Sequence, residues 1–334
     1  MPRALLLASV AALALGLGAA VKAPPPYRYG RAGNKTDRAG APRAGFALMG
    51  GGTDLDQAFQ WMCRRAGGGD FLVLRASGSG AYDPYIEKLC PRLNSVATLI
   101  IPSRTAAAAP FVVGRIREAS AIFISGGDQS RYVNSWQGTP VEAGLNGAIR
   151  RGVPLGGTSA GLAVLGEFAY SAQHDRPHGP NLTSAAALAD PFDPQVVVVR
   201  NFLTNPALRS LITDTHFHAR NRLGRLLVFM ARILAAGEAP VIYGVGVDQH
   251  TALLVDGNGR AVAAGTGAVY LISAGGQPSV CRAGQPLSFG PVAVRRLSAG
   301  QRFNLSTWRG LGITYTLTVR AGAITSSQPG GAIY

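Results

Sequence analysis

From residue 45 onward, short continuous apolar runs alternate with longer amphipathic stretches, and this alternation constrains the fold most strongly. Continuous apolar runs are typical of strands buried on both faces, and such strands occur in parallel sheets covered by helices. The expected strands are 46–49, 71–74, 96–101, 121–125, 153–156, 196–199, 211–215, 241–247, 251–255 and 269–272. The expected helices are 54–65, 84–89, 111–118, 141–151 and 221–235. The pattern therefore predicts an α/β fold with a doubly wound, mostly parallel sheet.

The composition divides the chain into four segments. Residues 1–20 have the pattern of a secretory signal peptide, because Arg3 precedes an apolar stretch that is shorter than the ~20 residues of a membrane span. A linker rich in Pro, Gly and Arg is expected at 21–43, the main domain at 44–275, and a small β-rich appendage at 276–334. We therefore expect a secreted or periplasmic protein that has no stable membrane anchor once the signal peptide is removed.

The net charge of +15 invites a nucleic-acid interpretation, but its location argues against one. Residues 1–43 carry +6 and residues 276–334 carry another +6, which leaves only +3 for the main domain. The chain also lacks an aromatic-rich RNA signature and zinc-finger spacing. We therefore expect no nucleic-acid partner.

The cysteines and the first glycine cluster bear on disulfides, metals and cofactors. Cys63, Cys90 and Cys281 are odd in number and lack metal-ligand spacing. An oxidising compartment would permit Cys63 to pair with Cys90, but the sequence does not place the two within bonding distance. Gly50, Gly51 and Gly52 follow an expected strand, yet neither a Lys-Ser/Thr pair nor a Gly-x-Gly-x-x-Gly pattern accompanies them. No metal and no cofactor are expected.

A candidate nucleophile lies in the segment Gly157-Thr158-Ser159-Ala160-Gly161, a Gly-x-Ser-x-Gly pattern between an expected strand and an apolar helical stretch. A nucleophile on such a tight turn needs small neighbours, so that its hydroxyl is exposed and the next backbone N–H can face an oxyanion. The spacing makes Ser159 the candidate nucleophile.

A candidate base and a cluster of arginines follow a later strand. His216 lies in Asp214-Thr215-His216-Phe217, at the end of an expected strand and thus at the same edge of the sheet as Ser159. A histidine there can take the serine proton and return it to a leaving amine. Arg220, Arg222 and Arg225 come next, where a helix is expected to begin. Three arginines at the positive end of a helix dipole would repel one another, so a bound carboxylate or an acidic neighbour is expected beside them.

Three motifs together resemble the cyanophycinase family. They are Ser125-Gly126-Gly127-Asp128-Gln129, the segment 157–161, and the pattern Asp-x-His-Phe-x-x-Arg-x-Arg-x-x-Arg over 214–225. That family belongs with the α-aspartyl dipeptidases, serine peptidases whose fold is like that of class I glutamine amidotransferases. The resemblance covers roughly residues 44–275. It implies hydrolysis of the β-linked aspartyl-arginine polymer cyanophycin into dipeptides, through an acyl-enzyme, in a homodimer.

The resemblance also implies a role for each matching residue. Ser159 would be the nucleophile and His216 the general base. The oxyanion would be bound by the backbone of Ala160, Gly127 and Asp128. A peptide or isopeptide substrate carrying Asp carboxylates and Arg side chains would be held by Gln129, Asp214, Arg220, Arg222 and Arg225. The acidic member of the triad is expected at Asp175, with Glu167 as the alternative.

Other functions remain open on the sequence. An α-aspartyl dipeptidase differs only in the isomer of the Asp-Arg bond that it cleaves, and a secreted binding protein could keep the pocket without catalysis. A classical α/β-hydrolase shares Gly-x-Ser-x-Gly, but its histidine normally lies far towards the end of the chain, whereas expected strands follow His216 here. The serine peptidase is the favoured interpretation.

Overall fold

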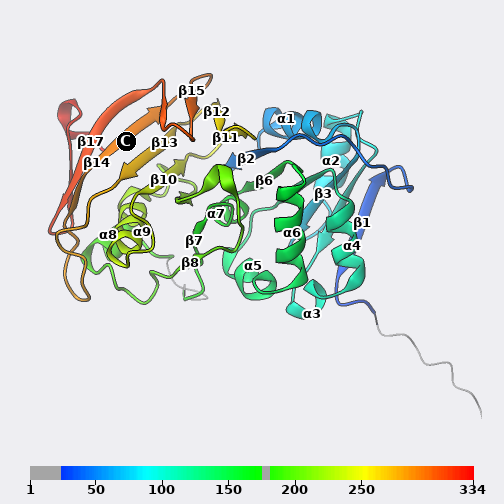
Figure 1. The fold of residues 1–334 in the computed structure, drawn as a ribbon, viewed down its shortest axis with the longest axis horizontal. Coiled ribbons are helices and arrows are strands. Elements are labelled where there is room, and N and C mark those ends of the chain that lie inside the picture. The colour runs from blue at the N-terminus through cyan, green and yellow to red at the C-terminus, as the bar shows by residue number, and fades with distance from the viewer. Residues whose placement is uncertain (1–23, 175–180) are drawn as a thin grey trace, which may run out of the picture.

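The computed structural model describes residues 24–174 and 181–334, which form two sheets flanked by helices (Figure 1). The expected signal peptide and Asp175 lie outside these described residues. The α/β prediction is confirmed, because helices and strands alternate through the first half of the chain and pack into one body.

The first sheet has ten strands in the order β1-β4-β3-β5-β6-β2-β11-β12-β15-β16. Its central strands, β4, β3, β5, β6 and β2, run parallel to one another, and the strands on either side are antiparallel. The bounds are β1 (Arg28–Gly33), β2 (Gly45–Met49), β3 (Asp70–Arg75), β4 (Ser95–Ile100), β5 (Ala121–Ile124), β6 (Leu155–Thr158), β11 (Thr251–Asp256), β12 (Arg260–Gly265), β15 (Arg302–Asn304) and β16 (Arg309–Gly310).

The second sheet has eight strands in the order β18-β17-β14-β13-β10-β9-β7-β8. Only β7, β9 and β10 are parallel in it. The bounds are β7 (Phe168–Tyr170), β8 (Val198–Arg200), β9 (Leu211–Asp214), β10 (Ile242–Val247), β13 (Val269–Ala274), β14 (Phe289–Leu297), β17 (Ile313–Arg320) and β18 (Ala323–Ser326).

The expectation of a mostly parallel sheet is wrong for the described chain as a whole, since the sheets are mixed. A parallel connection needs a crossover of a dozen or more residues, usually a helix. After β10 most connections are short, such as the turn 257–259 between β11 and β12, and their strands pair antiparallel. The parallel prediction holds where helices separate the strands.

Helices cover both faces of the parallel strands. α1 and α2 pack on one face, and α4, α5 and α6 pack on the other. The bounds are α1 (Asp56–Ala66), α2 (Tyr82–Leu89), α3 (Arg104–Ala107), α4 (Pro110–Glu118), α5 (Gln129–Trp136), α6 (Pro140–Arg150), α7 (Ala160–Ala163), α8 (Ser184–Ala189) and α9 (Leu223–Ala235). None of the helices in the described part of the chain has the length and apolar character needed to cross a bilayer.

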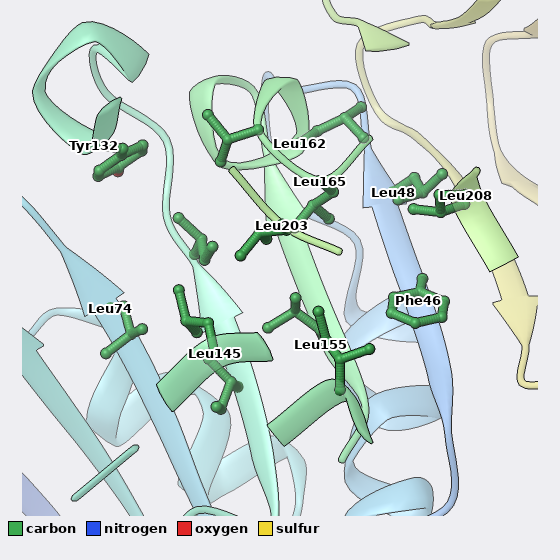
Figure 2. Packing of buried hydrophobic residues seen from close by; sticks show 14 of the residues in the cluster. Phe46, Leu48, Leu74, Tyr132, Leu145, Leu155, Leu162, Leu165, Leu203 and Leu208 are labelled. Carbon is green, nitrogen blue, oxygen red and sulfur yellow. The ribbon is translucent and has the colours of Figure 1, made fainter. Parts of the chain in front are cut away.

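The packing explains why the strand sequences are apolar without a break. In β2, Phe46 and Leu48 join the cluster that contains Leu145 of α6, and this cluster is shown in Figure 2. The alternate residues Ala47 and Met49 join the cluster on the other face, beneath α1 and α2. Both faces of the strand are buried, so no position of β2 is left for a polar side chain.

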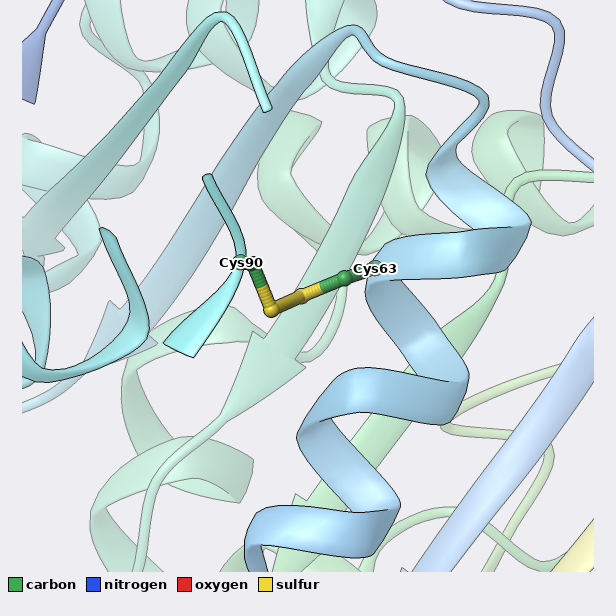
Figure 3. The surroundings of a disulfide bond; sticks show 2 residues. All are labelled: Cys63 and Cys90. Atoms are coloured by element: carbon green, nitrogen blue, oxygen red, sulfur yellow. A yellow bond between two sulfur atoms is a disulfide. The ribbon is translucent and has the colours of Figure 1, made fainter. Parts of the chain in front are cut away.

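A disulfide joins the two helices on one face of the sheet. Cys63 of α1 is bonded to Cys90, which directly follows α2, with their Cα atoms 6.2 Å apart (Figure 3). The pairing that the sequence left open is therefore made. Cys281 carries a free thiol, and its burial raises the pKa of that thiol.

The segments outside 44–275 also take part in the sheets. Residues 28–33, within the expected linker, form β1 and pair antiparallel with β4. Their sequence, Arg-Tyr-Gly-Arg-Ala-Gly, has no continuous apolar run, because the strand lies at an edge and is partly exposed. The strands within 276–334 extend both sheets, with β15 and β16 in the first and β14, β17 and β18 in the second. The strand-rich tail is thus built into the body.

Candidate active site

Ser159 lies on a tight turn between β6 and α7, with the backbone angles φ 51° and ψ −117°. The neighbouring glycines are required by close approaches of the main chain. A Cβ on Gly157 would lie 2.4 Å from the carbonyl carbon of Gly161, and a Cβ on Gly161 would lie 2.0 Å from the carbonyl oxygen of Ile124. A left-handed φ at a residue with a side chain is strained, and such residues cluster at functional sites.

The structure brings Ser159 and His216 together. The hydroxyl oxygen of Ser159 lies 2.8 Å from Nε2 of His216. His216 follows β9 and is held by its backbone N–H, which donates to the carbonyl oxygen of Gly50 at 2.7 Å. A Cβ on Gly51 would lie 2.5 Å from the imidazole ring. The first glycine cluster therefore makes room for the histidine ring.

Gln249 occupies the other side of the His216 ring. Its Nε2 lies 2.7 Å from Nδ1 of His216. With the amide nitrogen at this place, Gln249 donates to Nδ1, and the ring proton then sits on Nε2 and points at Ser159. Rotating the Gln249 amide by half a turn brings its Oε1 to the Nδ1–H of His216. The Nε2 of His216 then carries no proton and can accept the proton of the serine hydroxyl. Proton transfer from Ser159 requires this second arrangement.

The sequence did not point to Gln249. The acidic candidates Asp175 and Glu167 lie within 16 residues after Ser159, whereas Gln249 follows β10. The strands β9 and β10 are parallel neighbours, with Asp214 beside Gly246. The segments that leave their carboxyl ends therefore meet at the same edge. The signal in the sequence was a polar residue two positions after the end of β10.

Of the two residues considered for the acidic position, only Glu167 lies within the described part of the chain, and it is bound elsewhere. Asp175 lies outside the described residues. Glu167 accepts hydrogen bonds from the guanidinium of Arg200, at 2.8 and 3.0 Å, and from the backbone N–H of Ser210 at 2.7 Å. Glu167 is thus bound to the β7–β8 region and leaves the imidazole to Gln249.

The environment of His216 favours its neutral form. Burial is the largest cause, and the positive charges of Arg220 and Arg222 add to it, so that the pKa of His216 falls to about 4. The carboxylate of Asp214 acts in the opposite direction but is outweighed. A neutral imidazole at physiological pH is the form that a general base requires.

Asp214 is the acidic neighbour of the arginine cluster. It is buried and makes a bidentate pair with Arg225, with distances of 2.7 Å from Nε to Oδ2 and 2.6 Å from the terminal nitrogen to Oδ1. Arg222 lies 3.5 Å from the same carboxylate and donates to the carbonyl and hydroxyl oxygens of Thr215 at 3.0 and 2.9 Å. Burial lowers the pKa of Arg222 to about 10. The repulsion expected from the sequence is relieved within the protein.

Arg220 differs from the other two arginines because it is exposed. No carboxylate of the described residues lies within ion-pair distance of its guanidinium. Arg220 lines a cavity of about 420 Å³ together with Ser159. A free guanidinium in a cavity beside a serine is suited to bind a carboxylate of a ligand.

The same cavity brings together the other residues singled out from the sequence. Gly127, Asp128, Gln129 and Ala160 line it, together with Arg222 and Arg225. Asp128 precedes α5 and caps it, since its side chain accepts from the backbone N–H of Ser130 at 2.9 Å. A larger hollow, of about 800 Å³, surrounds the disulfide and has none of these residues in its lining. The candidate nucleophile and the candidate substrate-binding residues therefore line the smaller cavity.

The family model of peptidase family S51 matches residues 46–262. The chain belongs to peptidase family S51. It is 28% identical to a cyanophycinase of Synechococcus elongatus over 264 residues, which cover 75% of each chain. It is 30% identical to a cyanophycinase of Nostoc sp. over 220 residues, which cover 64% of this chain and 66% of the relative. A crystal structure of a peptidase from an acI-B1 Actinobacterium covers 79% of this chain and 98% of its own, with 18% identity and a TM-score of 0.49.

These likenesses make the protein a serine-type, cyanophycinase-like peptidase of the S51 family. The S51 match spans β2 to β12 and so contains Ser159, His216 and Gln249. It leaves out β1 and β13 to β18. Those strands lie outside the matched region.

Proposed function

We propose that the protein hydrolyses the β-linked aspartyl-arginine polymer cyanophycin, or related isopeptides, into dipeptides through an acyl-enzyme on Ser159. The observation that carries this proposal is the 2.8 Å contact between Ser159 Oγ and His216 Nε2 in a cavity lined by the free Arg220. The cyanophycinases to which the chain is similar support the choice of substrate.

In the first half of the reaction, Ser159 Oγ attacks the carbonyl carbon of the substrate amide while His216 Nε2 takes the hydroxyl proton. The negative charge that develops on the carbonyl oxygen would be bound by the backbone N–H of Ala160 and by the backbone at Gly127 and Asp128. His216 then gives its proton to the leaving amine, the C–N bond breaks, and the acyl group stays on Ser159.

In the second half, water replaces the amine. His216 accepts a proton from the water as its oxygen attacks the acyl carbon, and Ser159 leaves with that proton. Each proton taken by His216 puts a positive charge on a ring surrounded by Arg220 and Arg222. The amide of Gln249 stabilises the charged imidazole at Nδ1–H only through its dipole, whereas a carboxylate at this position would stabilise it with a full negative charge. We therefore expect a slower peptidase than one with a carboxylate at this position.

The charges of the cavity suit a substrate that carries both signs. Arg220 is exposed in the cavity and can bind an aspartyl carboxylate. The exposed carboxylate of Asp128 lies 3.9 Å from Arg131 and could bind an arginine side chain of the substrate in its place. Arg222, Arg225 and Asp214 are all buried. The two arginines would therefore act on the substrate mainly through the electrostatic potential of this charged cluster and not through direct contact. Gln129 would hold the substrate by hydrogen bonds.

We further propose an exported homodimer. The disulfide between Cys63 and Cys90 supports an oxidising compartment, since such bonds persist mainly outside the reducing cytosol. The signal pattern of residues 1–20 supports the same route. The dimer rests on the family resemblance alone, and light scattering of the purified protein tests it. The helices on both faces of the parallel strands support the doubly wound, glutamine amidotransferase-like description.

The decisive experiment incubates the purified protein with insoluble cyanophycin and with α- and β-linked Asp-Arg peptides, and identifies the products by mass. We expect dipeptides from the polymer in the wild type. The matched variant Ser159→Ala should release none above background, because loss of a triad member costs on the order of 10⁶ in kcat. Cleavage of only α-linked peptides would identify an α-aspartyl dipeptidase, and unchanged release by Ser159→Ala would refute the mechanism.

A further inference from the structure

Tyr334 contacts the segment that carries His216 and Arg220. Its hydroxyl donates to Oδ1 of Asn221 at 2.9 Å and accepts from the backbone N–H of Leu223 at 3.1 Å. Burial raises the pKa of Tyr334 to about 12, so the hydroxyl keeps the proton that it donates. The Tyr334 hydroxyl therefore links Asn221, which follows His216 and Arg220, to Leu223, the first residue of α9.

The ring of Tyr334 adds contacts to the same segment. It packs edge-on against Phe217, with ring centroids 5.8 Å apart, and lies 4.6 Å from the ring centroid of His218. Phe217 is fully buried and directly follows His216. Tyr334 thus contacts the segment both next to the candidate base and at its far end.

The segment needs such support because its backbone is strained. His216 and Asn221 both have a left-handed φ, of 46° and 47°. Residues with side chains hold this conformation only where the surroundings fix it. Within the segment, the backbone N–H of Arg222 donates to Phe217 at 2.9 Å, which closes a tight turn. Ser184 donates to the carbonyl oxygen of Asn221, so that Asn221 is held through its main chain and its side chain.

Tyr334 is itself held in place by the second sheet. The hydroxyl of Tyr315 in β17 donates to the carbonyl oxygen of Ile333 at 3.2 Å, and Gln328 donates to the carbonyl oxygen of Ala332 at 2.7 Å. The ring of Tyr334 also meets Tyr270 of β13 edge-on, with centroids 5.6 Å apart. All of these residues lie outside the region 46–262 that the family model matches.

We propose that Tyr334 is a positioning residue for the peptidase reaction: through Asn221 and Phe217 it fixes the 216–222 turn, so that His216 faces Ser159 and Arg220 faces the cavity. This inference rests on the proposed function. Tyr334 contacts Asn221, Leu223 and Phe217, so it acts through the turn. The segment after residue 262, outside the matched region, thereby has a function in the active site.

The test replaces Tyr334 by Phe, which keeps the ring and removes both hydrogen bonds. The readout is the rate at which a fluorophosphonate probe labels Ser159, because that reaction needs His216 but no peptide substrate. We expect labelling, and kcat on the substrate, to fall about five- to tenfold, with little change in KM and in the thermal midpoint. Asn221→Gly should have a similar effect, since glycine keeps the left-handed turn and removes the amide. The double variant should be no slower than Tyr334→Phe, because the bond that Asn221→Gly removes is already lost in Tyr334→Phe.

Tyr85→Phe is the matched control, because it removes a tyrosine hydroxyl that donates to Asp56 on the helical face of the first sheet and has no part in holding Tyr334. It should label at the wild-type rate. Wild-type labelling by Tyr334→Phe, or an equal loss in Tyr85→Phe, would overturn the inference. Labelling of the wild type without cleavage of any Asp-Arg substrate would refute the proposed substrate alone and would leave the role of Tyr334 supported by the labelling rates.

Discussion

Gln249 Nε2 lies 2.7 Å from Nδ1 of His216, so an amide occupies the position from which a carboxylate would stabilise a charged imidazole. The two residues follow neighbouring parallel strands, and their contact is fixed by the sheet. An amide can orient the ring but adds no negative charge. Burial, and after it the positive charges of Arg220 and Arg222, lower the pKa of His216 to about 4.

Replacing Gln249 by Glu should therefore increase activity. The carboxylate would favour the imidazolium that forms in the transition state, and replacing a triad carboxylate by an amide costs on the order of 10⁴ in kcat in a serine peptidase. We expect kcat at pH 8 to rise about tenfold or more. The carboxylate also raises the pKa of His216, and the base must be neutral, so the acidic limb of kcat/KM should move from near pH 4 to higher pH.

The measurement is a pH profile of kcat/KM for the wild type, Gln249→Glu and Gln249→Leu. Gln249→Leu is the control, since it fills the space without a polar group, and it should be slower than the wild type throughout. An unchanged profile in Gln249→Glu would show that residue 249 does not act on His216.

The sequence was informative where the structure depends on local patterns. The Gly-x-Ser-x-Gly spacing predicts the turn at Ser159, because Gly157 closely approaches Gly161 within that turn. The contact of Ser159 with His216 spans 57 residues but was expected, since both residues follow strands that the sequence predicts to end at one edge of the sheet. Gln249 could not be found in the same way, since an amide is rarely sought at a triad position. The pairing of Asp214 with Arg225 depends on how α9 packs, and this geometry required the structure.

Arg220 should contribute to substrate binding and not to folding. Arg220→Ala removes the free guanidinium of the cavity, and a hydrogen bond to a charged group contributes about 1.5–3 kcal/mol. We expect KM to rise about tenfold or more, while the thermal midpoint stays unchanged because the side chain is exposed. Arg309→Ala removes an exposed arginine of β16 and should leave KM as in the wild type. A wild-type KM in Arg220→Ala would contradict the assignment.

Asp214 should contribute to stability as well as to the site. In Asp214→Asn the guanidinium of Arg225, which is only 2% exposed, loses the bidentate carboxylate of Asp214. Breaking one side of a buried ion pair costs about 3–5 kcal/mol. We expect a clear fall in the midpoint of thermal unfolding. Asp37→Asn offers a comparison, because Asp37 pairs with Arg115 at the surface and the loss should be below about 1 kcal/mol. Equal midpoints for the two variants would mean that the buried pair is not required.

Asp83 should make the stability of the protein depend on pH. The side chain is 6% exposed and is hydrogen-bonded to the hydroxyl of Thr98. Burial raises the pKa of Asp83 to about 6, above its unfolded value near 3.8. The folded state therefore binds the proton more tightly than the unfolded state does, and stability should fall as the pH rises from about 4 to 6 and then level off. The difference in pKa corresponds to a penalty of about 2–3 kcal/mol above pH 6.

Asp83→Asn tests this dependence, because the amide keeps a hydrogen bond with Thr98 and never ionises. Urea unfolding at pH 4, 5, 6 and 7.5 should give equal stabilities for the variant and the wild type at pH 4, and a more stable variant at pH 7.5. Glu238→Gln removes an exposed carboxylate and should follow the wild type at every pH. If Asp83→Asn is less stable than the wild type at pH 7.5, the ionised carboxylate is favourable in the fold, and the sign argued from burial is wrong.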